Sequence, residues 1–91
     1  MVYHKISIDG YNIVIIVSNS EYEAIGYYLK EIIGSSPTTY VYASDLDIEV
    51  LSADHEVEME CVGFPVYQTL EEIYNKKEDK SIPQKLVGLI E

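Results

Sequence analysis

Apolar and polar residues alternate through the first positions of the chain, and an unbroken β-branched run follows at residues 13–17. The dipeptide Asp9-Gly10 lies between the two segments. Asp-Gly favours a two-residue type I′ turn, because both central residues of that turn take positive φ angles. The pattern therefore predicts a β-hairpin over residues 2–17, whose second strand is central in a sheet because five β-branched residues cannot all face water.

The register of this hairpin decides which side chains share a face. A two-residue loop sets Ile6 opposite Ile13, and the face predicted as core then carries Val2, His4, Ile6, Ile8, Tyr11, Ile13, Ile15 and Val17. The second face carries three apolar residues, which need a cover from a helix or from another subunit. We therefore predict a homodimer interface formed by Tyr3, Val14 and Ile16.

Two capping boxes predict two helices. Ser20 with Glu23 opens a helix that ends at Gly34, and Thr69 with Glu72 opens a shorter helix that continues to about residue 77. Helical spacing predicts that the first helix buries a stripe made of Tyr22, Ile25, Leu29, Ile32 and Ile33. Proline is tolerated in a first helical turn, so a terminal helix is expected over residues 83–90, with a final strand as the alternative.

Strict period-two alternation predicts two half-exposed strands at residues 46–50 and 56–61, joined by a loop. A four-residue loop pairs Glu49 with Glu58, since apolar residues then meet apolar partners across the pair. Another strand is expected at residues 38–43, which are β-branched and aromatic. The order ββαβββαα predicts one α+β domain over residues 1–91, with helices packed on a mostly antiparallel sheet of about five strands.

Charge narrows the range of functions. The chain carries sixteen acidic residues, six lysines and no arginine, for a formal net charge of −10. Such a chain is repelled by nucleic acid and by anionic lipid, so we expect it to bind neither directly. The lone Cys61 fits a reducing compartment, and neither a signal peptide nor an apolar run of about 20 residues is present, so we expect a cytoplasmic protein.

The predicted pairing of the two alternating strands gathers carboxylates on one face, with no basic residue in either strand: Asp47, Glu49, Glu56, Glu58 and Glu60. Like charges directly opposite each other destabilise a sheet by about 0.2–1 kcal/mol per pair. Three interpretations are open. The face is simply solvated, which discourages edge pairing; it docks a basic partner; or it holds a hard cation such as Ca²⁺.

No catalytic motif is present in the sequence. The residues His4, His55 and Cys61 lack the spacing of a zinc site, and there is no glycine-rich phosphate loop or nucleophile elbow. Among the nine tyrosines, Tyr40 and Tyr42 share one face of the strand expected at 38–43. Tyrosine is enriched at interface hot spots, so this pair would extend a docking surface.

We therefore expect a non-enzymatic, acidic protein-binding module, an inhibitor or adaptor that docks its carboxylate-rich strand face onto a basic partner; a protein that holds nucleic acid would be a natural target. The expected partner-binding residues are Asp47, Glu49, Glu56, Glu58, Glu60, Tyr40 and Tyr42. No catalytic residue, metal or cofactor is expected. By analogy with a class of proteins, the small size and the lack of arginine suit a phage- or virus-encoded inhibitor. The alternatives are a small-molecule-binding or ligand-sequestering protein with a tyrosine-lined pocket, and a Ca²⁺-binding protein.

Overall fold

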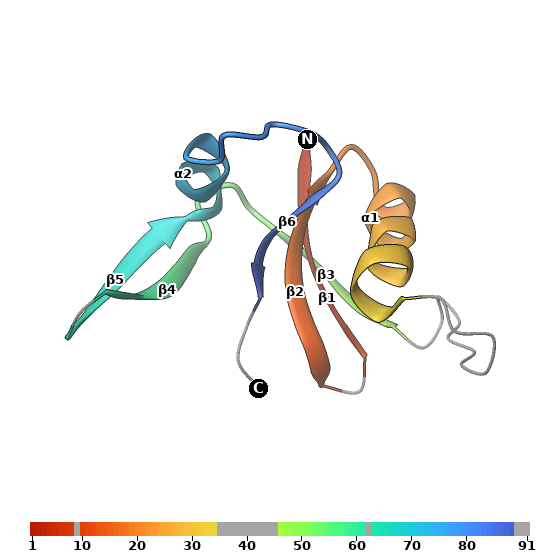
Figure 1. Ribbon diagram of the computed structural model, residues 1–91, viewed down its shortest axis with the longest axis horizontal. Coiled ribbons are helices and arrows are strands. Elements are labelled where there is room, and N and C mark those ends of the chain that lie inside the picture. Colours follow the sequence, from red (N-terminus) through yellow and green to blue (C-terminus); the bar gives the residue numbers. More distant parts are fainter. Residues whose placement is uncertain (9, 35–45, 62, 89–91) are drawn as a thin grey trace.

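An antiparallel sheet of four strands, in the order β3-β1-β2-β6, forms the centre of the fold (Figure 1). The computed structural model describes residues 1–8, 10–34, 46–61 and 63–88, and within these ranges β4 and β5 form a separate two-stranded sheet. The elements in chain order are β1 (Val2–Ile8), β2 (Tyr11–Ser18), α1 (Glu21–Tyr27), the π-helical η1 (Tyr28–Ile33), β3 (Leu46–Leu51), β4 (Glu56–Cys61), β5 (Phe64–Thr69), α2 (Leu70–Asn75) and β6 (Gln84–Gly88). The predicted α+β class is confirmed, with six strands in the described ranges rather than about five.

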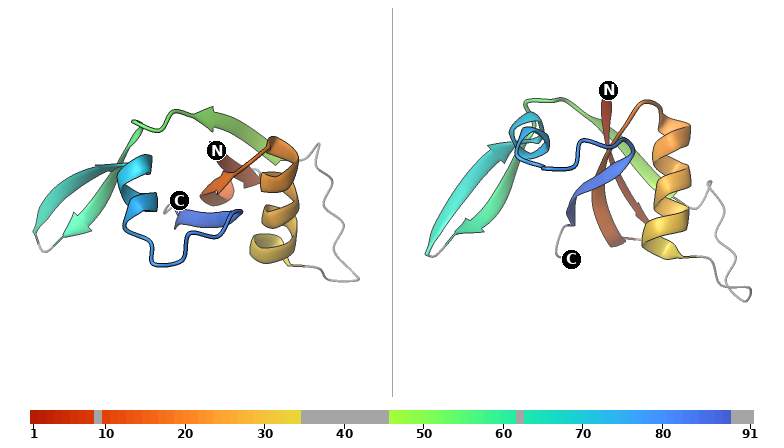
Figure 2. Two further views of the ribbon diagram at one scale, coloured as in Figure 1. Left: turned by 90° about the horizontal axis from the view of Figure 1, so that it is seen from above. Right: turned by 45° about the horizontal axis from the view of Figure 1, so that its top comes forward.

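The two faces of the four-stranded sheet are covered by different elements. Figure 2 shows α1 against one face, and α2 with the projecting β4–β5 hairpin on the opposite side. The core accordingly divides into two clusters. The cluster on the α1 side contains Ile6, Val14, Ile16, Ala24, Tyr28 and Leu46, and the cluster on the α2 side contains Tyr3, Ile15, Val17, Leu51, Val57, Leu70, Ile73 and Leu86. Strand β2 is thus buried on both faces, which explains its continuous aliphatic run.

The first hairpin contains a bulge that the sequence did not predict. Ile8 pairs with Tyr11, as expected from a two-residue turn, but Ile6 pairs with Val14 instead of Ile13. Strand β2 therefore has one extra residue near Asn12, whose φ is +50°. A β-bulge of this kind moves every following side chain to the other face, so the predicted division of the two faces is wrong beyond the turn.

The bulge and the two helices also remove the basis for the predicted dimer interface. Tyr3, Val14 and Ile16 are 4%, 5% and 0% exposed, and all three are buried within a single chain. They also lie on opposite faces, since Tyr3 belongs to the α2-side cluster and the other two to the α1-side cluster. These residues are covered by the chain's own helices, so they do not form the exposed apolar face from which a homodimer was predicted.

The first helix begins where its capping signal indicates. The Ser20 hydroxyl accepts a hydrogen bond from the Glu23 amide at 3.2 Å, while the Glu23 carboxylate accepts one from the amide of Asn19. The predicted buried stripe is only partly correct: Ile25, Leu29, Ile32 and Ile33 are partly buried against the core, but Tyr22 is 85% exposed and the fully buried residues are Ala24 and Tyr28. Tyr22 precedes the buried Ala24 by two residues, which places the two side chains about 160° apart around the helix axis.

The second capping box is confirmed, but the end of the chain differs from the prediction. Thr69 and Glu72 cap each other at the start of α2, with the two reciprocal hydrogen bonds at 3.1 and 3.3 Å. Within the segment expected as a terminal helix, residues 84–88 form the strand β6, which pairs antiparallel with β2, so the alternative prediction of a final strand is confirmed. The edge of β2 supplies backbone partners for this strand, and Leu86 becomes buried in the α2-side cluster.

The two alternating acidic strands do not pair with each other. Strand β3 pairs with β1, and β4 pairs with β5; Gly63, just before β5, has a φ of +85°. The predicted β3–β4 hairpin is therefore wrong, although both segments are strands. The strand expected at residues 38–43 lies outside the described residues. None of the helices in the described ranges combines the length and the apolar character that a membrane crossing requires.

Candidate functional site

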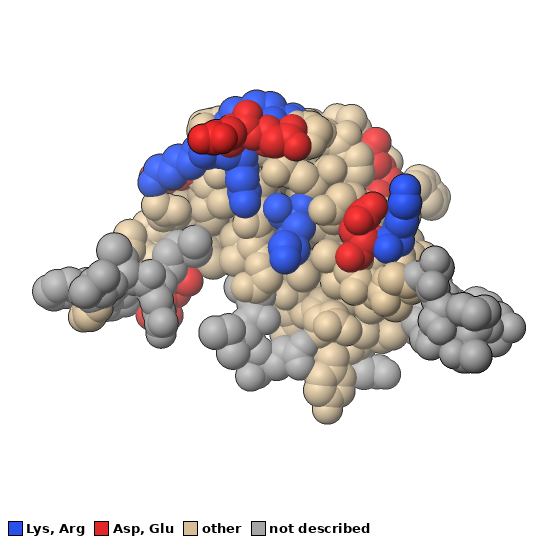
Figure 3. Space-filling model, viewed as in Figure 1, with Lys and Arg blue, Asp and Glu red and all other residues tan. Residues whose placement is uncertain are grey.

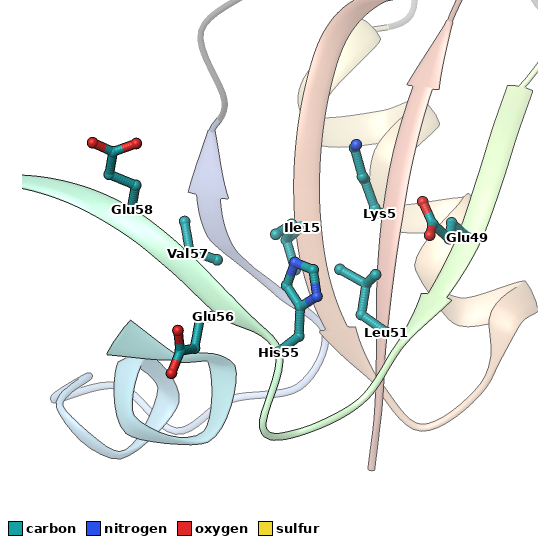
Figure 4. Close-up of a pocket in the computed structure, with 8 residues that line it drawn as sticks. All are labelled: Lys5, Ile15, Glu49, Leu51, His55, Glu56, Val57 and Glu58. Carbon is teal, nitrogen blue, oxygen red and sulfur yellow. The ribbon is translucent and has the colours of Figure 1, made fainter. Parts of the chain in front are cut away.

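A hollow of about 270 Å³ lies where the β4–β5 hairpin leaves the face of the sheet (Figure 4). Strands β1, β2 and β3 supply one side of it, and the 52–55 loop with β4 supplies the other. Its lining residues are Lys5, Ile15, Glu49, Leu51, His55, Glu56, Val57 and Glu58. The hollow thus joins residues that are more than fifty positions apart in the sequence.

Strand register brings the sheet side of the hollow together. Lys5 lies directly opposite Ile15 on one neighbouring strand and directly opposite Glu49 on the other. The three side chains consequently share one face of the sheet, because directly paired residues of an antiparallel ladder point the same way. The single lysine of the hollow therefore faces one of its carboxylates across the β1–β3 pair.

The opposite side of the hollow is positioned by the first turn of α2. The Leu70 amide donates to the His55 carbonyl at 3.0 Å, and the Glu71 amide donates to the Ala53 carbonyl at the same distance. These amides belong to the start of a helix, where backbone N–H groups have no partner within the helix. The loop after β3 satisfies them, and this contact turns the chain so that β4 leaves the sheet instead of folding back on β3.

The hollow has an apolar floor and a charged rim. Ile15, Leu51 and Val57 are at most 9% exposed, and all three belong to the α2-side cluster. The rim consists of exposed side chains together with the half-buried Lys5, and its exposed members are Glu49, His55, Glu56 and Glu58. The rim carries three carboxylates against one lysine ammonium.

A second hollow of about 280 Å³ continues along β1 and β3, lined by Lys5, Ser7, Asp47, Ile48 and Glu49. It shares Lys5 and Glu49 with the first. We name the two hollows together the acidic groove. Along its length the groove presents four of the predicted carboxylates: Asp47, Glu49, Glu56 and Glu58.

The predicted site residues are therefore brought together only in part, and by a different arrangement from the one expected. Glu58 lies opposite Tyr67, and Glu60 is paired with Pro65 on the β5 strand. The predicted Glu49–Glu58 pair across one ribbon does not exist, and a lysine is present among the carboxylates. The side chain of Glu60 and all of Tyr40 and Tyr42 lie outside the described parts of the structure.

Three residues of the groove and its border were missed by the sequence analysis. Lys5 and His55 line the first hollow, and Tyr67 is 58% exposed directly opposite Glu58. Lys5 could be assigned to the groove only from the pairing of β1 with β3, because this long-range pairing leaves no signal in the sequence around Lys5. Tyr67 could be placed there only from the β4–β5 pairing, because no strand was expected at residues 64–69; proline is compatible with a strand at a sheet edge.

Electrostatics in the 52–55 loop add to the negative character of this region. A hydrogen bond from the Ser52 side chain lowers the pKa of Asp54 below its ordinary value of 3.8, with further lowering from a backbone N–H and from His55. Figure 3 shows lysine side chains gathered over α2 and the segment after it. Lys5 is the one lysine that lines the two hollows described above.

Within the described residues, the acidic groove has the features neither of a metal site nor of a tyrosine-lined pocket. Among the described residues, no group of three histidine, cysteine, aspartate or glutamate side chains is arranged to hold a metal ion. Neither hollow of the acidic groove has a tyrosine in its lining. Comparison of the chain with family models, curated proteins and solved structures finds no match.

Proposed function

We propose that this chain is a non-enzymatic, cytoplasmic protein-binding module, an inhibitor or adaptor that docks its acidic groove onto a basic surface of another protein. The observation that supports this proposal is that Glu49, Glu56 and Glu58 all line one hollow, which has an apolar floor. The three carboxylates come from two different sheets. The surface of a protein that binds nucleic acid is a natural target, because it already presents lysine and arginine to phosphate groups.

The shape of the groove favours docking over a merely solvated face. Carboxylates that only increase solubility need no concave surface and no buried floor beneath them. A lysine or arginine side chain of a partner would lay its aliphatic stem on Ile15, Leu51 and Val57 and bring its charged end to the rim. An apolar centre surrounded by a polar rim is also the usual anatomy of a protein–protein interface.

The charge of the whole chain would assist the encounter. A formal net charge of −10 attracts a basic partner before contact and raises the association rate, and salt weakens this effect because the screening length is only about 8 Å at physiological ionic strength. Catalysis is less compatible with the site, since general acids and bases act within enclosed clefts, and the rim carboxylates are exposed.

Two triple variants with the same net charge test the proposal. The groove variant carries Glu49→Gln, Glu56→Gln and Glu58→Gln. The control carries Glu21→Gln, Glu31→Gln and Glu78→Gln, all at exposed positions outside the groove lining. Binding of a decalysine peptide is measured by calorimetry over a range of salt concentrations, and lysate capture with the wild type and both variants then identifies natural partners.

We expect the control to bind decalysine as tightly as the wild type, and the groove variant to bind about tenfold more weakly, since a few rim contacts together supply roughly 1.4 kcal/mol. All binding should weaken as salt is raised. An equal loss in the two variants would show that net charge alone attracts the peptide, and it would overturn the assignment of the groove.

A further inference from the structure

The four-stranded sheet has two edges, β3 and β6, and they differ in how they are protected. In the described ranges, β3 pairs with β1 alone and β6 pairs with β2 alone. An edge strand presents a row of backbone N–H and C=O groups, and proteins usually protect such a row with lysine, proline, a bulge or a short strand.

Strand β6 has several of these protective features. It is five residues long, carries the exposed Lys85, ends at Gly88, and pairs with β2 through a register that shifts between Ile15 and Ile16. Strand β3 is protected only by the charged side chains of Asp47 and Glu49. Its register with β1 is unbroken from Leu46 to Leu51, and it contains no lysine, proline or glycine.

The side chains of β3 indicate what kind of strand this edge would accept. Asp47 and Glu49 are exposed and line the acidic groove, whereas Val50, on the other face, is 69% exposed. If two copies of β3 paired with each other, carboxylates would lie near carboxylates, so self-association through this edge is disfavoured. A partner strand with basic residues at alternate positions would instead be attracted by the same carboxylates.

We propose that the edge of β3 is a site of strand addition, at which an extended basic segment of the partner pairs with Leu46–Leu51. Its alternate lysine or arginine side chains lie over Asp47 and Glu49, and an apolar side chain on its other face covers Val50. Backbone hydrogen bonds supply affinity in this mode of recognition, and alternate side chains supply specificity. The inference rests on the proposed function and adds the backbone geometry of docking to it.

The test uses a seven-residue peptide of alternating lysine and valine, with both ends blocked. Its matched control has the same sequence and charge but carries N-methyl groups on alternate amides, which removes the donors of one edge. Binding is measured with the full chain, and amide hydrogen exchange of residues 46–51 and 84–88 is followed by NMR with and without peptide.

We expect the unmodified peptide to protect every second amide of β3 about tenfold or more against exchange, with no change in β6, because strand addition pairs only the outward-facing amides. The N-methylated peptide should bind about tenfold more weakly, since several backbone hydrogen bonds are lost. The double variant Asp47→Asn, Glu49→Gln should bind the unmodified peptide more weakly by a similar factor. The control double variant Glu21→Gln, Glu31→Gln should bind it as tightly as the wild type does.

Several results would overturn strand addition. Equal affinity for the two peptides would mean that charge alone holds them, and the proposed function would then survive without this inference. Protection of alternate β3 amides in the free protein would show that the chain itself already occupies the edge. Protection appearing in β6 instead of β3 would place the site at the other edge. Failure of the proposed function is recognised separately, by equal loss of decalysine binding in the two triple variants.

Discussion

The two faces of the central sheet are both apolar at their centres, yet they are covered to different extents. On one face, α1 and η1 form a continuous helical segment whose Ala24 and Tyr28 are fully buried against the sheet. On the other, the short α2 buries only Leu70 and Ile73 and is aided by the first residues of β4. The acidic groove lies on this second face, beside the part that α2 covers (Figure 4).

The alternation of side chains along β1 and β3 follows this difference in cover. Toward α1 these strands present Ile6 and Leu46, and toward the groove they present Lys5, Asp47 and Glu49. Charged side chains are therefore placed where the helical cover stops. Because the same two strands contribute to both faces, the length of the covering helix sets how much of each face is available for binding.

Core truncation on each face should give the largest effects. Ile16→Ala on the α1 side and Leu70→Ala on the α2 side should each lower the free energy of unfolding by about 2–5 kcal/mol, through lost burial and cavity formation. Leu70→Ala should also weaken decalysine binding, because α2 holds the 53–55 loop at the groove. Urea unfolding and calorimetry at a temperature where both variants are folded provide the measurements. Unchanged affinity of Leu70→Ala would show that the groove does not depend on α2.

Two buried tyrosines, one on each face, should respond with opposite signs to loss of their hydroxyl groups. The Tyr28 hydroxyl donates to the Asn12 carbonyl at 2.9 Å, whereas the buried Tyr3 hydroxyl has no hydrogen-bond partner among the described residues. Tyr28→Phe should therefore destabilise the fold by about 1 kcal/mol, and Tyr3→Phe should stabilise it by a similar amount. Chemical denaturation of the two variants is sufficient, and a change of the same sign in both would contradict this account.

The same Tyr3 hydroxyl predicts a difference at alkaline pH. Burial raises the pKa of Tyr3 above 10.0, with a further contribution from the nearby charge of Glu71. The folded state then holds this proton more tightly than the unfolded state, so its contribution to stability is lost as pH rises above 10. We expect the stability of the wild type to fall more steeply above pH 10 than that of Tyr3→Phe. If stability fell with pH equally steeply in the two proteins, the raised pKa of Tyr3 would be refuted.

Replacing the lysine of the groove should have a moderate effect on binding. Lys5→Met removes the positive charge opposite Glu49 and should strengthen decalysine binding about threefold, which corresponds to roughly 0.6 kcal/mol. Its effect on stability should stay within about 1 kcal/mol. The control is Lys30→Met, which changes the net charge equally at an exposed position on η1. An equal gain in the two variants would show that the position of the charge is unimportant.

The smallest effect is expected in the segment between α2 and β6. The Ser81 amide donates to a carboxylate oxygen of Asp79 at 2.8 Å, and this bond lowers the pKa of Asp79 below 3.8. The contribution to stability is present above that pH and is lost as pH falls through the lower folded-state value. Asp79→Asn should therefore make stability slightly less sensitive to acid, as measured by unfolding between pH 5 and about pH 2. A steeper acid dependence in the variant would contradict this sign.

Local features of this protein follow from the sequence alone. Ser20 and Thr69 cap helices where their spacing to Glu23 and Glu72 indicated, because each cap is made within four residues. The turn that pairs Ile8 with Tyr11 has the same short range. Alternation likewise indicated which carboxylates of the two acidic strands are exposed, since successive strand residues point to opposite faces. The α+β class and the exposure of four groove carboxylates could therefore be predicted from such signals.

Tertiary structure decided which elements meet. Alternation shows which side chains of a strand share a face, but it does not show which strand lies next to it. The pairing of β3 with β1, and the formation of β6 beside β2, therefore depended on strand edges that are far away in the sequence. One extra residue near Asn12 exchanged the two faces of the first hairpin, because side chains on a strand repeat every second residue. The same long-range pairing placed Lys5 opposite Glu49 and made a groove out of carboxylates that the sequence had assigned to a single ribbon.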